Sequence, residues 1–359
     1  MLNTKVLHVV ARMNVGGTAR YIEELVINIP GSALATGVVQ DAEVEDEAVS
    51  RLLVYRIPHM GRKIAPLKDF RSWIELRSLI KLLKPEIVHT HTFKAGLIGR
   101  LIKGSHRNVH TFHGHLFGDD SFNRIAKVGI LLAERFLAKK TDLLISVGIN
   151  VGKELRQIGI GEKNKWLSIA PGVLQLPKIE KKKAREELGL SRDQFLVGWM
   201  ARVTAVKNPH LLLEVAEMMP DVSFIVAGGG DLLEEIQALA PENVTILGWT
   251  EASVFWSAVD CAISTSNNEG MPIALIEAQL AGIPVVATDV GSNSEVISHQ
   301  VTGFVTPRTP IALVAALRSL LNDRDLCAEM GRQASSRAQT IFSKDELINA
   351  HQTAYQTLL

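Results

Sequence analysis

Short apolar segments of strand length alternate with helical segments along nearly the whole chain, and no other feature of the sequence limits the fold as strongly. Such alternation is typical of parallel β-sheets whose strands are joined by helices. The predicted strands are residues 6–11, 87–89, 108–112, 143–147, 195–201, 223–227, 244–247, 261–264 and 285–287. The predicted helices are residues 20–28, 73–84, 126–139, 210–218, 232–239, 254–258 and 273–281.

The length of 359 residues exceeds what one hydrophobic core usually serves, so we predict two domains. Both are expected to be doubly wound, Rossmann-like α/β domains that face each other across a cleft. The proline-flanked segment 171–177 marks the boundary between an N-terminal domain, residues 1–174, and a C-terminal domain, residues 175–342. Ser343 and Glu346 form a capping box, and the helix of residues 343–359 is predicted to pack back on the N-terminal domain.

The composition is that of a soluble globular enzyme, with 47% hydrophobic and 21% charged residues. Because no window of about 18 apolar residues is present, we predict no membrane span. The two cysteines, Cys261 and Cys327, have neither the spacing of metal ligands nor that of a disulfide framework. We therefore expect a protein of the reducing cytoplasm.

Charge is divided unequally along the chain. Residues 1–175 contain 25 Lys and Arg against 16 Asp and Glu, whereas residues 176–359 contain 14 against 22. Much of the basic excess lies in residues 56–84, where apolar side chains are spaced as in an amphipathic helix. Such a helix can lie peripherally on an anionic membrane, or it can pack on the core and expose a solvated basic face. A nucleic-acid partner is not expected, because stacking aromatics and nucleic-acid motifs are lacking.

Two glutamates, Glu269 and Glu277, stand eight residues apart. Pro272 fits a first helical position, so residues 273–281 should form a helix in which Glu277 lies on an apolar stripe. A carboxylate there needs hydrogen-bond donors, from the protein or from ligand hydroxyls. Glu269 precedes the proline and belongs to a loop. The pair is either a core glutamate with an exposed loop glutamate, or two contacts to an extended polar ligand.

A short loop after the strand 195–201 carries two cations, Arg202 and Lys207. Asn208 and Pro209 fit the N-cap and first position of the next helix, which places Lys207 at a positive helix end. Two cations at such a helix end favour a diphosphate ligand, and without an anion they would repel each other. The alternative is a solvated pair of surface cations.

Glycines and histidines follow the strands of the first half. Gly16 and Gly17 let a backbone approach a ligand closely and leave helix amides for an anion, although a plain turn has the same sequence. His113 suits a hydrogen bond to a polar substrate. No metal site is predicted, because no carboxylate stands at a ligand spacing and alternation along the strands should send the histidines to different faces. His89 and His110 are interpreted as core histidines with satisfied nitrogens.

Taken together, these motifs resemble those of the family 4 glycosyltransferases, retaining enzymes of the two-domain GT-B type. The resemblance spans almost the full length and rests on Gly16-Gly17, the His113 loop, Arg202 with Lys207, and the segment from Glu269 to Glu277 that continues to Val286. His89-Thr90-His91-Thr92 with Lys94-Ala95-Gly96 resembles the members that build bacterial surface polysaccharides.

The resemblance implies a role for each matching residue. Arg202 and Lys207 would neutralise the donor diphosphate, Glu277 would hold the ribose hydroxyls, and Glu269 and His113 would contact the transferred sugar. Further donor contacts are expected from the residues around the glycine pair and the helix start, namely Gly16, Gly17, Gly270, Met271, Pro272 and Ile273. The catalytic set is then His113, Arg202, Lys207 and Glu269, with no metal and no cofactor besides the nucleotide sugar.

The resemblance also implies a function. The protein would transfer a sugar from a nucleotide diphosphate sugar, with a UDP-sugar favoured, to a glycan or lipid-linked acceptor. The chain departs from many members at Leu174 and at residues 291–295, and these changes bear on the donor preference. One alternative is a sugar-nucleotide epimerase of similar architecture, which should carry acidic residues where this chain has histidines. The other is a non-catalytic subunit that binds a sugar nucleotide.

Overall fold

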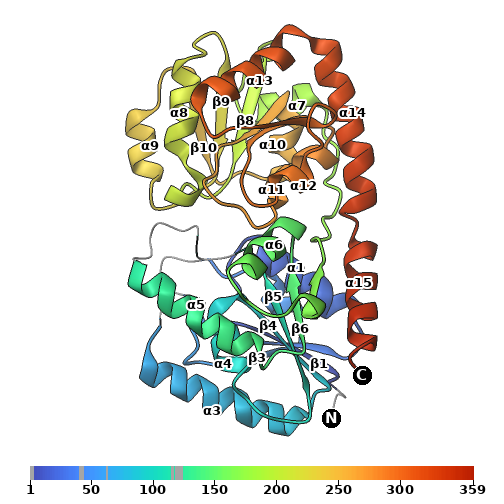
Figure 1. Ribbon diagram of the computed structural model, residues 1–359. Helices are drawn as coiled ribbons and strands as arrows, with labels where there is room; N and C mark the ends of the chain where they lie inside the picture. Colours follow the sequence, from blue (N-terminus) through green and yellow to red (C-terminus); the bar gives the residue numbers. More distant parts are fainter. Residues whose placement is uncertain (1–3, 40–43, 62–63, 115–116, 118–123) are drawn as a thin grey trace. The chain divides into compact units, whose positions relative to one another are not determined.

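In a computed structural model the chain divides into two compact α/β units (Figure 1). The structure describes residues 4–39, 44–61, 64–114, 117 and 124–359. The first unit comprises the described residues up to 172 together with Lys344–Leu359, and the second comprises Val173–Ser343. The sequence-based boundaries were 174 and 342. The cleft expected between the domains remains a prediction.

The described part of the first unit contains a seven-stranded, all-parallel sheet with the strand order β3-β2-β1-β4-β5-β6-β7. Its strands are β1 (Val6–Val10), β2 (Ser32–Thr36), β3 (Val54–Arg56), β4 (Ile87–His91), β5 (Arg107–Phe112), β6 (Leu143–Ser146) and β7 (Trp166–Ser168). Its helices are α1 (Gly17–Asn28), α2 (Ala48–Arg51), α3 (Pro66–Leu83), α4 (Thr92–Gly99), α5 (Arg124–Ala138), α6 (Ile149–Gln157) and α15 (Lys344–Gln356). Strands β2, β3 and β7 were not predicted from the sequence, nor were the helices α2, α4 and α6.

The described part of the second unit contains a six-stranded parallel sheet with the order β10-β9-β8-β11-β12-β13. Its strands are β8 (Leu196–Met200), β9 (Ser223–Ala227), β10 (Val244–Gly248), β11 (Cys261–Ser264), β12 (Val285–Thr288) and β13 (Gly303–Thr306). Its helices are α7 (Lys181–Glu187), α8 (Pro209–Glu217), α9 (Leu233–Leu239), α10 (Ala252–Ala258), α11 (Ile273–Leu280), α12 (Asn293–Val296), α13 (Pro310–Asn322) and α14 (Arg324–Ile341). Among these strands only β13 was not predicted, and the helices α7, α12, α13 and α14 were not predicted either.

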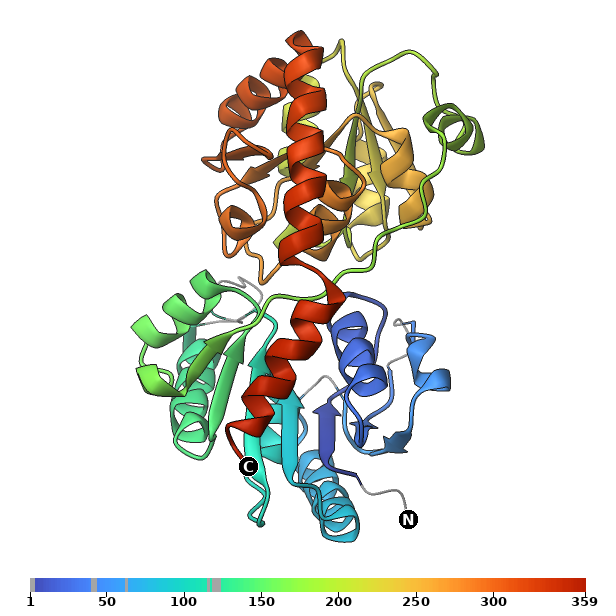
Figure 2. The same cartoon turned by 90° about the vertical axis from the view of Figure 1, so that its right-hand side faces the viewer.

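Alternation along β1 separates the two faces of the first sheet. Leu7 and Val9 pack with residues of α3 and α4, whereas Val10 packs with residues of α1 on the other face. His8 therefore points to the α1 face, because successive side chains of a strand point to opposite sides. The C-terminal helix α15 packs against α1 and covers this same face (Figure 2). His8, His89 and His91 lie on that face, whereas His110 lies on the other one.

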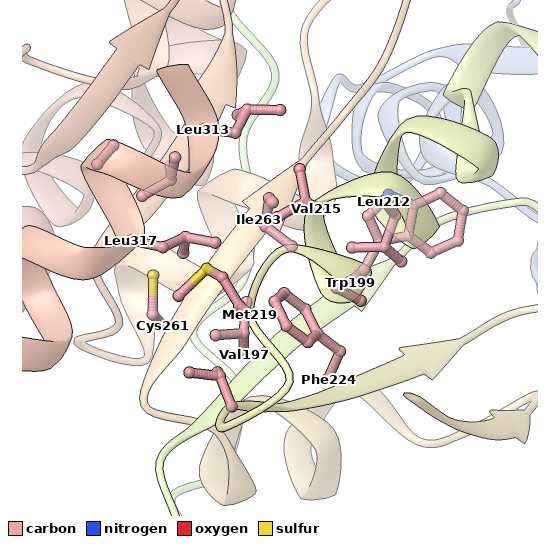
Figure 3. Close-up of a cluster of buried hydrophobic side chains, with 14 of the residues drawn as sticks. Val197, Trp199, Leu212, Val215, Met219, Phe224, Cys261, Ile263, Leu313 and Leu317 are labelled. Carbon is pink, nitrogen blue, oxygen red and sulfur yellow. The ribbon is translucent and has the colours of Figure 1, made fainter. Parts of the chain in front are cut away.

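The core of the second unit is apolar on both sides of its sheet. Figure 3 shows Val197 and Trp199 of β8 and Cys261 of β11 among side chains of α8 and α13. Both cysteines are free and buried, and burial raises the pKa of the Cys327 thiol to about 11. These strands are continuous apolar runs in the sequence, which is why their predicted limits lie close to the observed ones.

Candidate active site

In the second unit the strand order reverses between β8 and β11, which pair although β9 and β10 intervene in the sequence. Ligands of open α/β sheets bind outside the carboxyl ends of the strands at such a switch point. The loop after β8 carries Arg202 and Lys207, and the loop after β11 carries Glu269. The fold thus places the predicted cations and the predicted loop glutamate on adjacent loops.

Hydrogen bonds tie these two loops together. The Thr265 hydroxyl donates to the backbone carbonyls of Lys207 and Asn208, at 3.1 and 2.9 Å. The Asn267 amide donates to the carbonyl of Val206 at 2.8 Å, and the Asn208 side chain donates to the Asn267 Oδ1 at 3.1 Å. Asn208 also caps α8 as expected, since its side chain accepts from the Leu211 amide. The loops are therefore held at a fixed separation.

Lys207 and Glu269 form an ion pair across these loops, with the Lys207 Nζ 2.6 Å from the Glu269 Oε1. The Ser266 hydroxyl donates to the same oxygen at 2.7 Å. Glu269 is only 8% exposed, so it is not the exposed loop glutamate that the simpler interpretation required. The sequence analysis took both cations to lack a counter-charge unless an anion is bound, but Glu269 supplies that charge for Lys207.

Arg202 differs from Lys207 in its environment. Its side chain is exposed, and among the described residues it has no ion-pair or hydrogen-bond partner. It lies on the same short loop and follows β8 directly, so it is available to an anion that approaches the end of the sheet. The loop thus offers one neutralised cation and one uncompensated cation.

Helix α11 places Glu277 as the sequence predicted, buried at 3% exposure on a nearly continuous apolar helix. Pro272 is the N-cap and not the first helical residue, so the expected position was wrong by one residue. The amides of Gly270, Met271 and Ile273 have no acceptor within the part of the chain that the structure describes. Free amides at a helix start favour a bound anion.

The backbone of Gly291 packs against the backbone of Glu269, a contact that the sequence did not predict. Gly291 has a φ of +51°, and a Cβ at this position would lie 1.8 Å from the Glu269 carbonyl oxygen. Only glycine fits such a close approach without moving the loop. The signal in the sequence was Gly291 itself, the first residue of the segment 291–295 in which the chain departs from many family members.

In the first unit the strand order reverses between β1 and β4. Gly16, with a φ of +150°, precedes α1, which begins at Gly17. Across the switch point, β4 ends at His91 and the next residue, Thr92, has a φ of +66°. A β-branched residue in this left-handed region is strained, and such strain concentrates at functional sites. The predicted glycine pair and the predicted histidine loop therefore lie at the ligand-binding end of this sheet.

A cavity of about 250 Å³ opens beside Thr92. Most of its lining is apolar, and it is formed by Phe93, Phe112, His113, Phe117, Ile130 and Glu134. The Glu134 carboxylate is held by Arg100 at 2.7 and 2.8 Å, a buried pair that neutralises the wall of the cavity. His113 is the polar group of this wall that the sequence analysis proposed for substrate contact.

His113 belongs to a row of three imidazoles. The His113 Nε2 lies 3.1 Å from the His91 Nδ1, and the His91 Nε2 lies 3.1 Å from the His8 Nδ1. Burial lowers the pKa of His8 to about 3 and that of His113 to about 3, and it lowers the pKa of His91 well below its usual value. The three rings are neutral at physiological pH.

A second network joins the same strands to α15 and was not foreseen. The His351 Nδ1 donates to the Leu347 carbonyl at 2.9 Å, so its Nε2 accepts from the Tyr21 hydroxyl at 3.2 Å. Thr111 bonds both Tyr21 and the Nε2 of His89, at 2.7 Å from the latter. The His89 Nδ1 accepts from the Tyr355 hydroxyl at 2.6 Å. The only signal in the sequence was the spacing of His351 and Tyr355 by four residues in the last helix.

His89 has both ring nitrogens bonded, as expected of a core histidine. His110 does not fully agree with that expectation. Its Nδ1 lies 2.8 Å from the Thr90 Oγ1, but its buried Nε2 has no partner among the described residues.

The expected scattering of histidines to different faces is wrong for three of them. His89 and His91 are two residues apart on β4 and share a face, and the strand register places His8 beside His89. One nitrogen from each of these three rings lies within 4.8 Å of the others, close enough to hold a metal ion. Coordination there would require hydrogen bonds of His8, His89 or His91 to break.

Two family descriptions cover most of the chain. Residues 15–173 match the description Glycosyltransferase Family 4, and residues 180–337 match the description Glycosyl transferases group 1. A UDP-Gal:alpha-D-GlcNAc-diphosphoundecaprenol alpha-1,3-galactosyltransferase of Escherichia coli is 30% identical over 292 residues, which cover 75% of each chain. The capsular polysaccharide biosynthesis glycosyltransferase CapM of Staphylococcus aureus is 24% identical over 84% of each chain.

Solved structures share the fold over nearly the full length. HepE of Anabaena, in complex with UDP and glucose, has a TM-score of 0.83 and 18% identity, and the alignment covers 98% of this chain and 100% of that chain. The sucrose-phosphate synthase of Thermosynechococcus elongatus has a TM-score of 0.83 and 18% identity over 99% of both chains. With its two matching halves, its two parallel sheets and a relative at 30% identity, the chain belongs to the family 4 glycosyltransferases of the GT-B fold.

Proposed function

We propose that the protein is a retaining transferase that moves a sugar from a nucleotide diphosphate sugar, preferably a UDP-sugar, to a glycan or lipid-linked acceptor in surface polysaccharide synthesis. The observation that carries the proposal is the position of Lys207 and Glu269 beside the free amides of Gly270, Met271 and Ile273 at the switch point. The galactosyltransferase and capsular relatives support the acceptor class, and the UDP-bound neighbour supports the nucleotide.

In this proposal each site residue has one role. Lys207 and Arg202 bind the diphosphate, the amides of Gly270, Met271 and Ile273 after the Pro272 cap assist them, and Glu277 accepts hydrogen bonds from the ribose hydroxyls. Glu269 binds the transferred sugar once the diphosphate takes over Lys207. Gly16 and Gly17 allow the donor close approach to the start of α1, and His113 contacts the sugar.

The proposed chemistry needs no metal ion. As the bond between the anomeric carbon and the phosphate oxygen breaks, negative charge grows on the diphosphate, and Arg202 and Lys207 stabilise it. The acceptor hydroxyl attacks from the face that the phosphate leaves, and the departing phosphate oxygen takes the hydroxyl proton. The anomeric configuration is then retained without a second carboxylate, for which a ribose-binding Glu277 would be unavailable.

Saturation-transfer NMR of the protein against UDP-, GDP- and ADP-sugars tests the donor site. We expect one nucleotide sugar to bind the wild type. The same nucleotide sugar should not bind to Lys207→Ala or to Glu277→Ala. Lys182→Ala on α7 is the matched control, because Lys182 is exposed and lies outside the site. Binding that survives in both site variants would contradict the proposal. A donor that is bound but only epimerised would favour the epimerase alternative. A donor that is bound without any turnover would favour a non-catalytic subunit.

We further propose that the first unit lies on the anionic inner face of the cell membrane. Helices α3 and α5 both pack against α4 (Figure 1). Leu76 and Ile80 of α3 are buried, yet Leu67 and Phe70 of the same helix are 83% and 61% exposed. On α5 an exposed apolar stripe runs along Ile125, Val128, Leu132 and Phe136. Exposed apolar side chains next to basic ones favour a lipid surface with anionic headgroups.

Vesicle flotation tests this peripheral contact. Among the described residues every helix is too short or too polar to span a bilayer. We expect the wild type to float with vesicles that contain an anionic phospholipid and not with neutral ones. The combined charge reversal of Lys68, Arg71, Arg77 and Lys81 should abolish flotation, whereas reversal of the exposed Lys181, Lys182 and Lys183 of the second unit should not. Flotation that survives the first reversal would refute the proposal.

A further inference from the structure

The row formed by His8, His91 and His113 has a direction that the geometry decides. Each link joins an Nδ1 to an Nε2, and a neutral imidazole has one N–H and one bare nitrogen. All three rings must therefore carry their protons on the same kind of atom. Either every ring is protonated at Nδ1, with His8 donating to His91 and His91 to His113, or every ring is protonated at Nε2 and the row runs the other way.

The environment of His8, at the buried end of the row, decides between these two states. The His8 Nε2 is buried and has no partner among the described residues. In the Nε2-protonated state this atom would be a buried N–H without an acceptor, whereas in the Nδ1-protonated state it is only a bare lone pair. Orphaned buried N–H groups are rarer than under-satisfied acceptors. The Nδ1-protonated state is therefore favoured for all three rings.

The surroundings keep the row neutral. The groups that face it are Tyr21 from α1, His89 from β4, and His351 and Tyr355 from α15, while His110 of β5 lies on the opposite face of the sheet. Burial lowers the pKa of each of these histidines and raises the pKa of each of these tyrosines, so none of them carries a charge near neutral pH. The buried Arg100 and Glu134 that stand near His110 and the cavity neutralise each other.

We propose that His91, held in turn by His8, fixes His113 as the Nδ1–H tautomer, so that His113 presents a hydrogen-bond donor and not a base to the ligand. The His113 Nε2 is occupied by His91, and the Nδ1 has no partner among the described residues. This inference rests on the proposed function for the identity of the ligand group, which is a sugar hydroxyl oxygen. His91 is a positioning residue that acts through His113.

The tautomer can be measured on the protein without substrate. Selective ¹⁵N labelling of histidine, with two-bond ¹H–¹⁵N correlation spectra, separates a protonated ring nitrogen from a bare one. We expect the proton of His113 on Nδ1 in the wild type. His91→Leu removes the donor and should move the proton to Nε2, the position that free histidine side chains favour. His91→Asn keeps an N–H donor near the same place and should restore the Nδ1–H form.

Two results would overturn the inference. One is a proton on the His113 Nε2 in the wild type, a measurement that requires no variant to fold. The other is a metal ion bound stoichiometrically in the purified protein with His8 or His91 as a ligand, because a coordinated nitrogen cannot take part in the row. His110→Asn, on the opposite face of the sheet, is the control and should leave the His113 spectrum unchanged.

Kinetics then separates this inference from the proposed function. With the donor site intact, His91→Leu should lower kcat by roughly three- to tenfold, the value of one neutral hydrogen bond, with little change in KM. His91→Asn should recover most of that loss. A correct tautomer together with unchanged transfer in His91→Leu would refute the contact of His113 with the sugar, while a donor that never binds would refute the proposed function and leave the tautomer assignment standing.

Discussion

The Lys207 ammonium and the Glu269 carboxylate lie 2.6 Å apart, although 62 residues separate them in the chain. The pair joins the loops after β8 and β11, which meet only because those two strands are neighbours in the sheet. Glu269 therefore holds Lys207 in place before any anion arrives, and a diphosphate must compete with it. This competition makes the two residues separable by experiment.

Glu269→Gln should weaken transfer without weakening nucleotide binding. The change removes the carboxylate that competes for Lys207, so UDP affinity should stay equal or increase. The rate of sugar transfer should fall by roughly ten- to a hundredfold, the range expected for a lost hydrogen bond to a charged group. Calorimetry with UDP and a turnover assay measure the two effects. Glu235→Gln is the control, since Glu235 pairs with His210 away from the site. A parallel loss of UDP affinity would contradict this reasoning.

Arg202→Ala should weaken the binding of nucleoside diphosphates by about tenfold, which corresponds to about 1.4 kcal/mol. Arg202 has an exposed side chain and no partner among the described residues, so its charge is available to the ligand and subject to screening by salt. The loss should therefore be smaller at high ionic strength. Titration at two salt concentrations tests this. Equal affinities of the variant and the wild type at low salt would remove Arg202 from the site.

Gly291→Ala should damage the donor site, whereas Gly189→Ala should not. Both glycines have a positive φ, +51° and +66°, so both substitutions carry backbone strain. A Cβ at Gly291 meets the Glu269 carbonyl oxygen, while a Cβ at Gly189 meets open space. We expect loss of transfer only in the first variant and a small loss of thermal stability in the second. Normal turnover of Gly291→Ala would show that the Glu269 loop adapts.

The first unit should lose stability as the pH falls below about 6.5. Burial lowers the folded-state pKa of His8 and His113 to about 3 and that of His351 to about 4, from an ordinary value of 6.5. Between these values the unfolded chain binds protons that the folded chain does not, so the stability is fully present above pH 6.5 and is lost on acidification. Each group contributes a slope of up to about 1.4 kcal/mol per pH unit.

Urea unfolding at pH 7.5 and 5.5, followed by circular dichroism, measures this effect. The control Lys182→Ala leaves every histidine in place and should show the same pH dependence as the wild type. His351→Gln should show a weaker dependence, because one buried titrating group is gone. A free energy of unfolding that is independent of pH in this range would show that the histidines are not buried in solution.

Local sequence patterns were sufficient for most of the buried strands and for the cap of helix α8. Strands β9 and β11 have the predicted limits, and Asn208 caps α8 as its position before a proline predicts. The edge strands β3, β7 and β13 were missed because they have only three or four residues, and β3 in particular is only half-buried, so they lack the continuous apolar run that identifies a central strand. Strand β2 is an inner strand, and it was missed because its sequence, Ser-Ala-Leu-Ala-Thr, contains a single large apolar residue.

The exposure of α3 could not be predicted from its own sequence. Its apolar positions include both core residues such as Leu76 and exposed residues such as Leu67 and Phe70. The spacing alone describes one amphipathic helix, and which part of that apolar surface is covered depends on the neighbouring α4. The packing interpretation of residues 56–84 therefore holds for the buried part of the helix, and the membrane interpretation remains a proposal for the exposed part.

The sequence by itself determined the class of fold, the family and the residue types of the candidate site, because strand and helix periodicities, caps and loop motifs are local properties of the chain. Only the tertiary structure decided which of these residues meet. The partnership of Lys207 with Glu269 and the row of His8, His91 and His113 depend on strand order and register. Parallel strands far apart in the sequence become neighbours through hydrogen bonds between their backbones, and the identities of the side chains do not record which strands those are.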